Sequence, residues 1–297
     1  MLREDTIESD LLKSVEPLLK HCFGLNVSAA LDGLATLQTY TNELARRMAA
    51  LSQFDWVAAK RRLDELPTKS KQVMVLAASK GWFFGWHESI GELIALVERL
   101  SAIEDPYIDD CLSEYYRNNL NFLTDELVEK YPNRATVIMA AVRAHGAFGS
   151  DGYFLSIPVF IAQADGLLTE IAGVKSATMR ASGNTPELLG SKAVREKLGT
   201  DLESLDLVHP ILKLHELDFM KSTTEREKTA QTSGKPFAAL NRHQVIHGES
   251  WDYGTEINSL KAFSFLAFAG LHLPMILDSP LRTHKLWQAA MTPGLTD

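Results

Sequence analysis

Cysteine is scarce in this 297-residue chain, which contains only Cys22 and Cys111. The two lie far apart, and neither belongs to a CxxC pair or to a Cys/His spacing typical of metal sites. Disulfide scaffolds and thiolate zinc sites need several closely spaced cysteines, so neither is expected here. The scarcity of thiols fits a reducing compartment, and we predict a cytoplasmic protein that uses no cofactor.

Positive charge is also in short supply, with 30 Lys and Arg against 38 Asp and Glu and a formal net charge of −8. Residues 1–150 hold 16 basic against 21 acidic side chains, and residues 151–297 hold 14 against 17. A protein that coats nucleic acid needs a broad basic face to neutralise phosphates. Any contact with RNA must therefore depend on a local cationic pocket.

Long apolar runs are missing as well. The longest, residues 262–277, is interrupted by Gly270, His272 and Pro274 and is shorter than the roughly 20 apolar residues that cross a bilayer. Residues 1–5 are charged and lack the apolar stretch of a secretion signal. We therefore expect no contact with a membrane.

Strand signals are nearly absent, since neither sustained apolar/polar alternation nor an Asn-Gly hairpin turn occurs. Apolar residues recur instead at helical spacing, as at Leu11, Val15 and Leu18. With 45% hydrophobic residues the chain has ample material for a core. We predict an all-α, multi-helix protein.

Prolines mark two expected helix boundaries. Pro67 is predicted to close a helix over residues 54–66, because proline disfavours helical backbone in the residue before it. Asp105 and Pro106 combine an acidic N-cap with proline at the first helical position, a typical helix start. The helix that they open is expected to run to Tyr131.

Three glycines within residues 146–152 predict a flexible linker, and we place a module boundary there. It separates an N-terminal helical region of unknown role, residues 1–150, from a second helical module, residues 151–297. Within the second module, residues 205–230 are expected to be largely helical. A final apolar helix is expected to begin at about Asn258.

The second module contains the one segment whose residues suggest a catalytic or binding role rather than a role in packing. Residues 241–248 read NRHQVIHG, and they concentrate an arginine, two imidazoles and two side-chain amides. A guanidinium can bind two phosphate oxygens at once, and an imidazole can give or take a proton near neutral pH. This octet therefore suits cleavage of a phosphodiester.

We expect the octet to end a helix that begins just after Pro236, with Gly248 in left-handed backbone beyond it. Arg242 and His247 would then diverge by about 140° around the helix axis, at 100° per residue. One chain would not easily bring both to one phosphate. A two-fold dimer would supply two arginines and two histidines to a single cleft.

Two other interpretations of the octet stay open. His243 and His247 are four residues apart and share a helix face, which also suits a metal, although Gln244 stands where HExxH zinc sites have glutamate. No third ligand can be assigned, and we predict no metal. In the structural alternative, Arg242 or His243 merely caps a helix C-terminus, where the helix dipole favours cations.

The pair Arg242 and His247 resembles the arginine-x(4 to 6)-histidine motif of the HEPN superfamily. The resemblance covers about residues 151–285, and it includes the octet, the apolar helix after it and an upstream apolar helix with Asp165. In the family a polar residue typically follows the arginine, and His243 conforms. One toxin subgroup carries a tyrosine two positions after the histidine; Glu249 stands there, so regulation through that tyrosine is not implied.

The resemblance implies a HEPN-like helical-bundle core over residues 151–297 and metal-independent endoribonuclease activity in defence or stress response. It also implies a homodimer that acts on RNA, with a protein regulator as a further partner. In this interpretation His247 is the general acid or base, Arg242 stabilises the charged pentavalent phosphate, and His243 positions or assists.

Asn241, Gln244 and Asp165 are the candidate substrate-binding residues. Asp165 lies in an apolar stretch and needs a partner if it is buried. An ion pair with Arg242 is the functional interpretation, and a surface position is the alternative. Two other functions compete with catalysis: a noncatalytic module that binds a nucleotide, a nucleic acid or a protein partner, and a purely structural helical dimer.

Overall fold

The structure is a computed structural model of the 297-residue chain. The residues that it describes are 36, 38–43, 45–46, 55–86, 90–104, 107–182 and 187–278. The chain divides into two compact units, Met1–Arg61 and Arg62–Asp297, and the candidate site lies in the second. The helical spacing at residues 11–18 and the expected helix start at residues 105–106 lie outside the described residues.

The all-α prediction is confirmed, because the described residues are 77% helical and contain 12 α-helices, four short 3₁₀ or π turns and no strand. The longer helices are α3 (Trp56–Ser79), α4 (Ile90–Ala102), α5 (Ile108–Lys130), α6 (Ala135–Ala147), α7 (Gly149–Ala172), α8 (Leu189–Leu198), α11 (Thr223–Ser233) and α13 (Glu256–Ala267). The short elements are η2 (Pro132–Arg134), α9 (Leu202–Leu207), α10 (His209–Leu212), η3 (Leu214–Glu216), η4 (Asp218–Met220), α12 (Arg242–Ile246), the π-helical turn η5 (Phe268–His272) and α14 (Leu273–Leu277).

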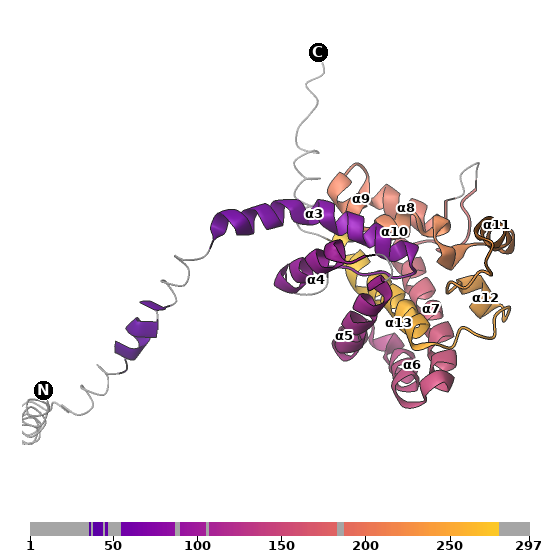
Figure 1. The fold of residues 1–297 in the computed structure, drawn as a ribbon, viewed down its shortest axis with the longest axis horizontal. Helices are drawn as coiled ribbons and strands as arrows, with labels where there is room; N and C mark the ends of the chain where they lie inside the picture. Colours follow the sequence, from indigo (N-terminus) through magenta and orange to yellow (C-terminus); the bar gives the residue numbers. More distant parts are fainter. Residues whose placement is uncertain are drawn as a thin grey trace, which may run out of the picture. The chain divides into compact units, whose positions relative to one another are not determined.

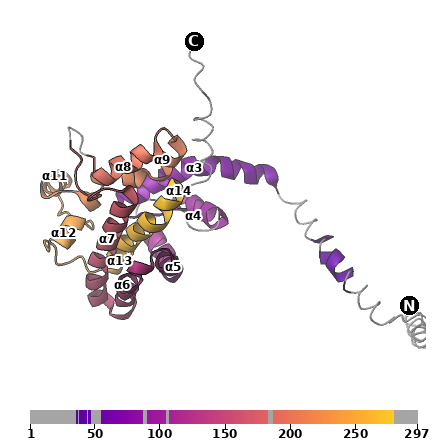
Figure 2. The same ribbon diagram turned by 180° about the vertical axis from the view of Figure 1, so that it is seen from behind.

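The core of the second unit is a bundle in which α13 packs against α5 and α7, and α6 packs against the same two helices. Both ribbon views show α13 between α5 and α7 (Figures 1 and 2). Leu260, Phe263 and Ala267 of α13 recur at helical spacing and are fully buried. Phe160 of α7 meets Phe263 edge-on, with ring centroids 5.3 Å apart. Burying a large apolar side chain contributes roughly 1.5–3 kcal/mol, so this contact anchors the bundle.

α3 continues through Pro67 to Ser79, and the predicted helix end at Pro67 is wrong. Leu66, Ser70 and Met74 lie one turn apart on the two sides of the proline, and all three are buried. Proline removes one backbone donor from the helix ladder. The buried face on both sides keeps the helix continuous in spite of that loss.

Residues 146–152 form a tight turn rather than a flexible linker. α6 ends at Ala147 and α7 begins at Gly149, whose φ is +55°. A Cβ placed on Gly152 would come within 1.9 Å of the Ala144 carbonyl oxygen. Glycine is therefore needed because the backbones of α6 and α7 touch. The expected module boundary lies between two packed helices, inside the unit that starts at Arg62.

The chain between α7 and the octet is built from short helices. The polar stretch 176–202 contains α8, and the long helix expected over residues 205–230 is divided among α9, α10, η3, η4 and α11. Pro210 opens α10, and Ser222 starts α11 with a capping box that Glu225 completes. These local starts prevent one continuous helix.

Two stretches, Gly149–Ala172 and Glu256–Leu277, are long and apolar enough to cross a membrane by length and composition. In the second, 83% of the most apolar window is buried inside the protein, and in the first 39%. Core helices of soluble proteins pass the same test. The absence of membrane contact stays a prediction.

Candidate functional site

The octet contains a whole short helix rather than the end of a longer one. Residues 235–240 are not helical, and α12 starts at Arg242 with Asn241 as its N-cap. Asn241 has extended backbone, and its Oδ1 accepts a hydrogen bond from the Gln244 N–H at 3.1 Å. Asparagine is a preferred N-cap because its side chain satisfies a backbone donor that the first helical turn leaves free. The predicted helix from Pro236 is therefore corrected to the short α12.

The end of α12 follows the expectation for glycine. His247 is the C-cap, and Gly248 takes the predicted left-handed backbone, with φ +69°. The backbone N–H of Glu249 then donates to the Gln244 carbonyl at 2.8 Å, which closes the turn. The two imidazoles therefore lie on a helix whose start and end are both fixed by local hydrogen bonds.

The side chain of Asn241 is fully used by the fold. Its Nδ2 donates to the carbonyls of Asp218 and Lys221 at 2.7 and 3.0 Å. Its Oδ1 also accepts from Nη1 of Arg226 at 3.1 Å, and the residue is only 1% exposed. An amide offers two donors and two acceptor positions, so none is left for a substrate. The predicted substrate-binding role of Asn241 is thereby corrected to that of a cap.

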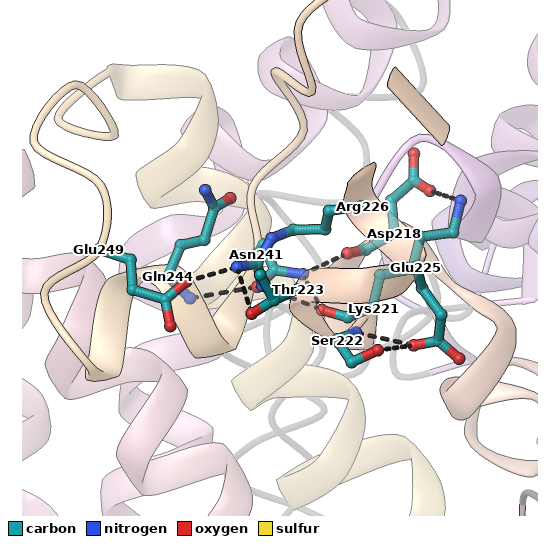
Figure 3. Close-up of polar contacts among 9 residues, drawn as sticks. All are labelled: Asp218, Lys221, Ser222, Thr223, Glu225, Arg226, Asn241, Gln244 and Glu249. Atoms are coloured by element: carbon teal, nitrogen blue, oxygen red, sulfur yellow. Dashed lines mark hydrogen bonds and ion pairs between the residues drawn. The ribbon is translucent and has the colours of Figure 1, made fainter. Parts of the chain in front are cut away.

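Arg226 of α11 holds both ends of the octet together. Figure 3 shows its guanidinium between Asn241, at the start of the octet, and Glu249, which follows Gly248. It donates to Asn241, to the Glu249 carboxylate and to Thr223 Oγ1. It is only 6% exposed, whereas the side chain of its charged partner Glu249 is 41% exposed. Nothing in the sequence distinguishes Arg226 from its charged neighbours in α11, and only its burial reveals this role.

Arg242 forms an ion pair with Asp165 of α7, with Nη2 2.7 Å from Oδ2. The two side chains are 18% and 21% exposed. Thr178 Oγ1 donates to the same carboxylate, 3.1 and 3.2 Å from its two oxygens. The expected ion pair between Asp165 and the octet arginine is therefore present, and its role in function stays a prediction. Because these contacts occupy its carboxylate, Asp165 positions Arg242 in this structure.

The guanidinium of Arg242 keeps unused donors. Its Nε is buried and has no hydrogen-bond partner among the described residues. Its Nη1 also makes no hydrogen bond with any described residue. A guanidinium has five N–H donors, so the pairing with Asp165 leaves donors for an anion such as phosphate.

His243 and His247 share a face of α12, as their spacing predicts. Their rings are nearly parallel, with an interplanar angle of 8° and centroids 6.0 Å apart. Burial lowers the pKa of His243 below its usual 6.5, and the positive charges of Arg242 and His247 lower it further. His243 is therefore neutral at pH 7 and able to accept a proton. His247 is exposed.

A single chain does not bring Arg242 and His247 into contact. Arg242 is paired with α7, while the ring of His247 lies beside His243. Across residues 55–86, 90–104, 107–182 and 187–278, no three His, Cys, Asp or Glu side chains form a group that could hold a metal. The histidine pair thus has no third protein ligand there.

A cavity of about 170 Å³ adjoins the octet beside Gln244. Asn241, Gln244 and Val245 form one part of its wall, and the chain on either side of the octet forms the rest. Unlike Asn241, Gln244 makes no side-chain hydrogen bond within the described residues, and its amide lies outside the dashed contacts in Figure 3. Gln244 is therefore the candidate substrate-binding residue whose side chain is still available.

The aromatic segment upstream of α4 belongs to the core. Trp82 is fully buried and stacks on Tyr116 with ring centroids 5.7 Å apart, and its Nε1 donates to Asp109 at 2.7 Å. Trp82 is therefore part of the buried core. Burial lowers the pKa of both His209 and His215, which are remote in sequence from the octet.

Comparison with known proteins found no matching family model, no matching curated protein and no matching solved structure. The resemblance to HEPN therefore depends on the octet and its helical surroundings alone.

Proposed function

We propose that this protein is a metal-independent endoribonuclease of HEPN type, with its active site on α12. The observation that carries the proposal is the placement of Arg242, held by Asp165 and left with free donors, on the same short helix as two neighbouring imidazoles. A fixed guanidinium beside a neutral imidazole suits the binding and cleavage of a phosphodiester.

In the proposed reaction the RNA 2′-hydroxyl attacks the adjacent phosphorus. The O2′–P bond forms and the P–O5′ bond breaks, which leaves a 2′,3′-cyclic phosphate and a 5′-hydroxyl. His247 takes the hydroxyl proton or gives one to the leaving oxygen, water serves for the other of these two proton transfers, and His243 positions or assists. Arg242 stabilises the added negative charge of the pentavalent phosphorus. RNA is the substrate because DNA lacks the attacking hydroxyl.

We further propose that the complete site is formed by a homodimer, because Arg242 and His247 do not meet within one chain. Exposed apolar side chains flank the histidines and support this: Ile246 lies on α12 and Trp251, in the loop after it, is 85% exposed. Aromatic residues are enriched at protein interfaces. Sedimentation equilibrium should give about twice 33.0 kDa, and a strict monomer would remove the composite site.

In line with the HEPN resemblance, we place the activity in the cytoplasm, in defence or stress response, with a protein regulator as a second partner. The alternative is a noncatalytic module that binds a nucleotide, a nucleic acid or a protein. The net charge of −8 favours a protein partner in that case.

Cleavage of single-stranded RNAs with and without EDTA tests the proposal. Wild-type protein should release 2′,3′-cyclic phosphate ends in both conditions, and His247→Ala should reduce the rate by about 10²- to 10⁴-fold. Arg242→Ala should abolish cleavage, and Arg242→Lys should retain little of it, since lysine lacks the planar fork. Arg143→Ala, at an exposed arginine of α6, is the matched control. Activity that EDTA abolishes would support the zinc alternative, and intact RNA in both conditions would contradict the proposal.

A further inference from the structure

The cavity beside Gln244 is built entirely from residues 236–258, the octet and its two flanks. Its volume is about 170 Å³. Sites for drug-sized ligands start at about 300 Å³. The cavity is therefore of a size for one small ring system rather than for a whole substrate.

The lining of this cavity excludes an anion. Among its lining residues there is no lysine, arginine or histidine, and Asp252 is the only charged side chain. Phe237 and Tyr253 supply aromatic rings, and Gln244 and Asn258 supply side-chain amides. A phosphate would meet a carboxylate and no cation there, whereas a flat ring with N–H donors would find stacking surfaces and acceptors. This lining is typical of a site for a nucleobase.

The cavity is placed where it can hold the base of a nucleotide whose phosphate lies at His243 and His247. Gln244 lines the cavity and precedes His247 by three residues, so their Cβ atoms lie roughly 5–6 Å apart on the surface of α12. Gln244 also directly follows His243 in the chain. One nucleotide can therefore place its phosphate at the imidazoles and its base in the cavity.

We propose that this cavity binds the base next to the scissile phosphate and selects guanine; the inference rests on the proposed ribonuclease function. Asp252 Oδ1 accepts a hydrogen bond from Ser250 Oγ at 2.7 Å, which orients the carboxylate. A carboxylate accepts two parallel N–H donors, and the Watson–Crick edge of guanine offers N1–H and N2–H together. Adenine, cytosine and uracil each present a single donor group on that edge. The free amide of Gln244 can donate to guanine O6.

Binding of the four nucleoside 3′-monophosphates to the full chain tests the proposal. The titrations use wild-type protein, because a nucleoside 3′-monophosphate has no P–O5′ bond to cleave and its phosphate needs both imidazoles. Guanosine 3′-monophosphate should bind at least about tenfold more tightly than each of the others, as expected for one bidentate contact. Asp252→Asn and Gln244→Ala should each remove most of that preference. Asp125→Asn makes the same charge change at an exposed position of α5, far from the cavity in sequence. This control should preserve the preference for guanine.

The outcomes separate this inference from the proposed function. Equal binding of the four nucleotides, no binding of any of them, or a guanine preference that survives Asp252→Asn would each overturn the base site, even if wild-type protein cleaves RNA. Selective guanine binding by a protein that leaves every RNA intact would support the base site and overturn the ribonuclease. If wild-type protein cleaves RNA preferentially on the 3′ side of guanine and Asp252→Asn cleaves without that preference, both the base site and the ribonuclease function are supported.

Discussion

Asp165 Oδ2 and Arg242 Nη2 lie 2.7 Å apart, which joins the middle of α7 to the first residue of α12 across 77 positions of sequence. Thr178 holds the same carboxylate from a third segment. The arginine of the octet is thus fixed by a helix of the bundle core. Its orientation depends on α7 as much as on the short helix that carries it.

Asp165→Asn should lower both stability and activity. The change keeps the shape of the side chain but leaves a largely buried guanidinium without a counter-charge. Exposed ion pairs contribute up to about 1 kcal/mol, and loss of one partner in a buried pair costs about 3–5 kcal/mol. For this intermediate burial we expect a loss of about 2 kcal/mol in the free energy of unfolding, measured with urea. RNA cleavage should fall with it, because Arg242 is no longer oriented.

Asp125→Asn is the control for that experiment, since Asp125 is exposed on α5. Its free energy of unfolding should stay within about 0.5 kcal/mol of wild type, as for surface substitutions generally. Equal stabilities of the two variants would show that the Asp165 pair holds nothing in place.

Arg226→Met should be more destabilising, by about 2–4 kcal/mol in urea unfolding. The variant keeps much of the apolar stem of arginine but leaves Asn241 Oδ1 and the Glu249 carboxylate without their shared donor. Lys228→Met, at an exposed position of the same helix, is the matched control and should change little. If Arg226→Met were as stable as Lys228→Met, the contacts of Arg226 with Asn241 and Glu249 would not stabilise the octet.

The long helices of the bundle could be predicted because their signals are local and repeated. The predicted end of α5 at Tyr131 differs by one residue from the observed end at Lys130. The apolar helix predicted to begin at about Asn258 begins at Glu256. In each case a buried face recurs over several turns, so one misleading residue does not obscure it.

The errors in the fold come from contacts that local rules do not contain. Pro67 predicts a helix end, but the helix continues because Leu66 and Met74 are buried on both sides of it. The glycines of residues 146–152 predict flexibility, whereas Gly152 is present because the Ala144 carbonyl touches it. Both are tertiary effects that override propensity.

At the candidate site, the ion pair between Asp165 and Arg242 could be predicted from the sequence, and the contacts of Arg226 could not. A carboxylate in an apolar helix needs a partner, and this requirement pointed from Asp165 to Arg242. The capping role of Asn241 had a local signal too, since asparagine is a preferred N-cap. The role of Arg226 had none, because its partners Asn241 and Glu249 lie 15 and 23 residues away.

The neutral state of His243 can be measured directly by following its imidazole ¹⁵N shifts against pH. Its pKa should lie below 6.5, because burial and neighbouring positive charges disfavour the imidazolium. Arg242→Gln removes one of those charges and should raise the pKa, while burial keeps it below 6.5. Arg143→Gln should leave it unchanged. A pKa above 6.5 in wild type would contradict the proposed neutral imidazole at the site.

His272 links three parts of the core through one imidazole. It lies in the π-helical turn η5 and is fully buried. Its Nδ1 lies 2.9 Å from the Trp86 backbone N–H, and its Nε2 lies 2.9 Å from the Leu207 carbonyl oxygen. Only the neutral ring with its hydrogen on Nε2 satisfies both contacts, since Nδ1 must accept and Nε2 must donate. A proton added to Nδ1 would face the N–H of Trp86.

The stability of the protein should therefore fall in mild acid through His272. Burial lowers the pKa of His272 from 6.5 to about 4, so between these values the unfolded chain binds a proton that the folded chain does not. The free energy of unfolding is thus highest above pH 6.5, and this residue should remove about 2 kcal/mol of it between pH 7 and pH 5. Urea unfolding at both pH values measures the difference. His272→Gln can still accept from Trp86 and donate to Leu207, but glutamine does not titrate. Its loss in the free energy of unfolding between pH 7 and pH 5 should therefore be about 2 kcal/mol smaller than that of wild type. Equal declines in the two proteins would show that His272 does not carry the acid sensitivity.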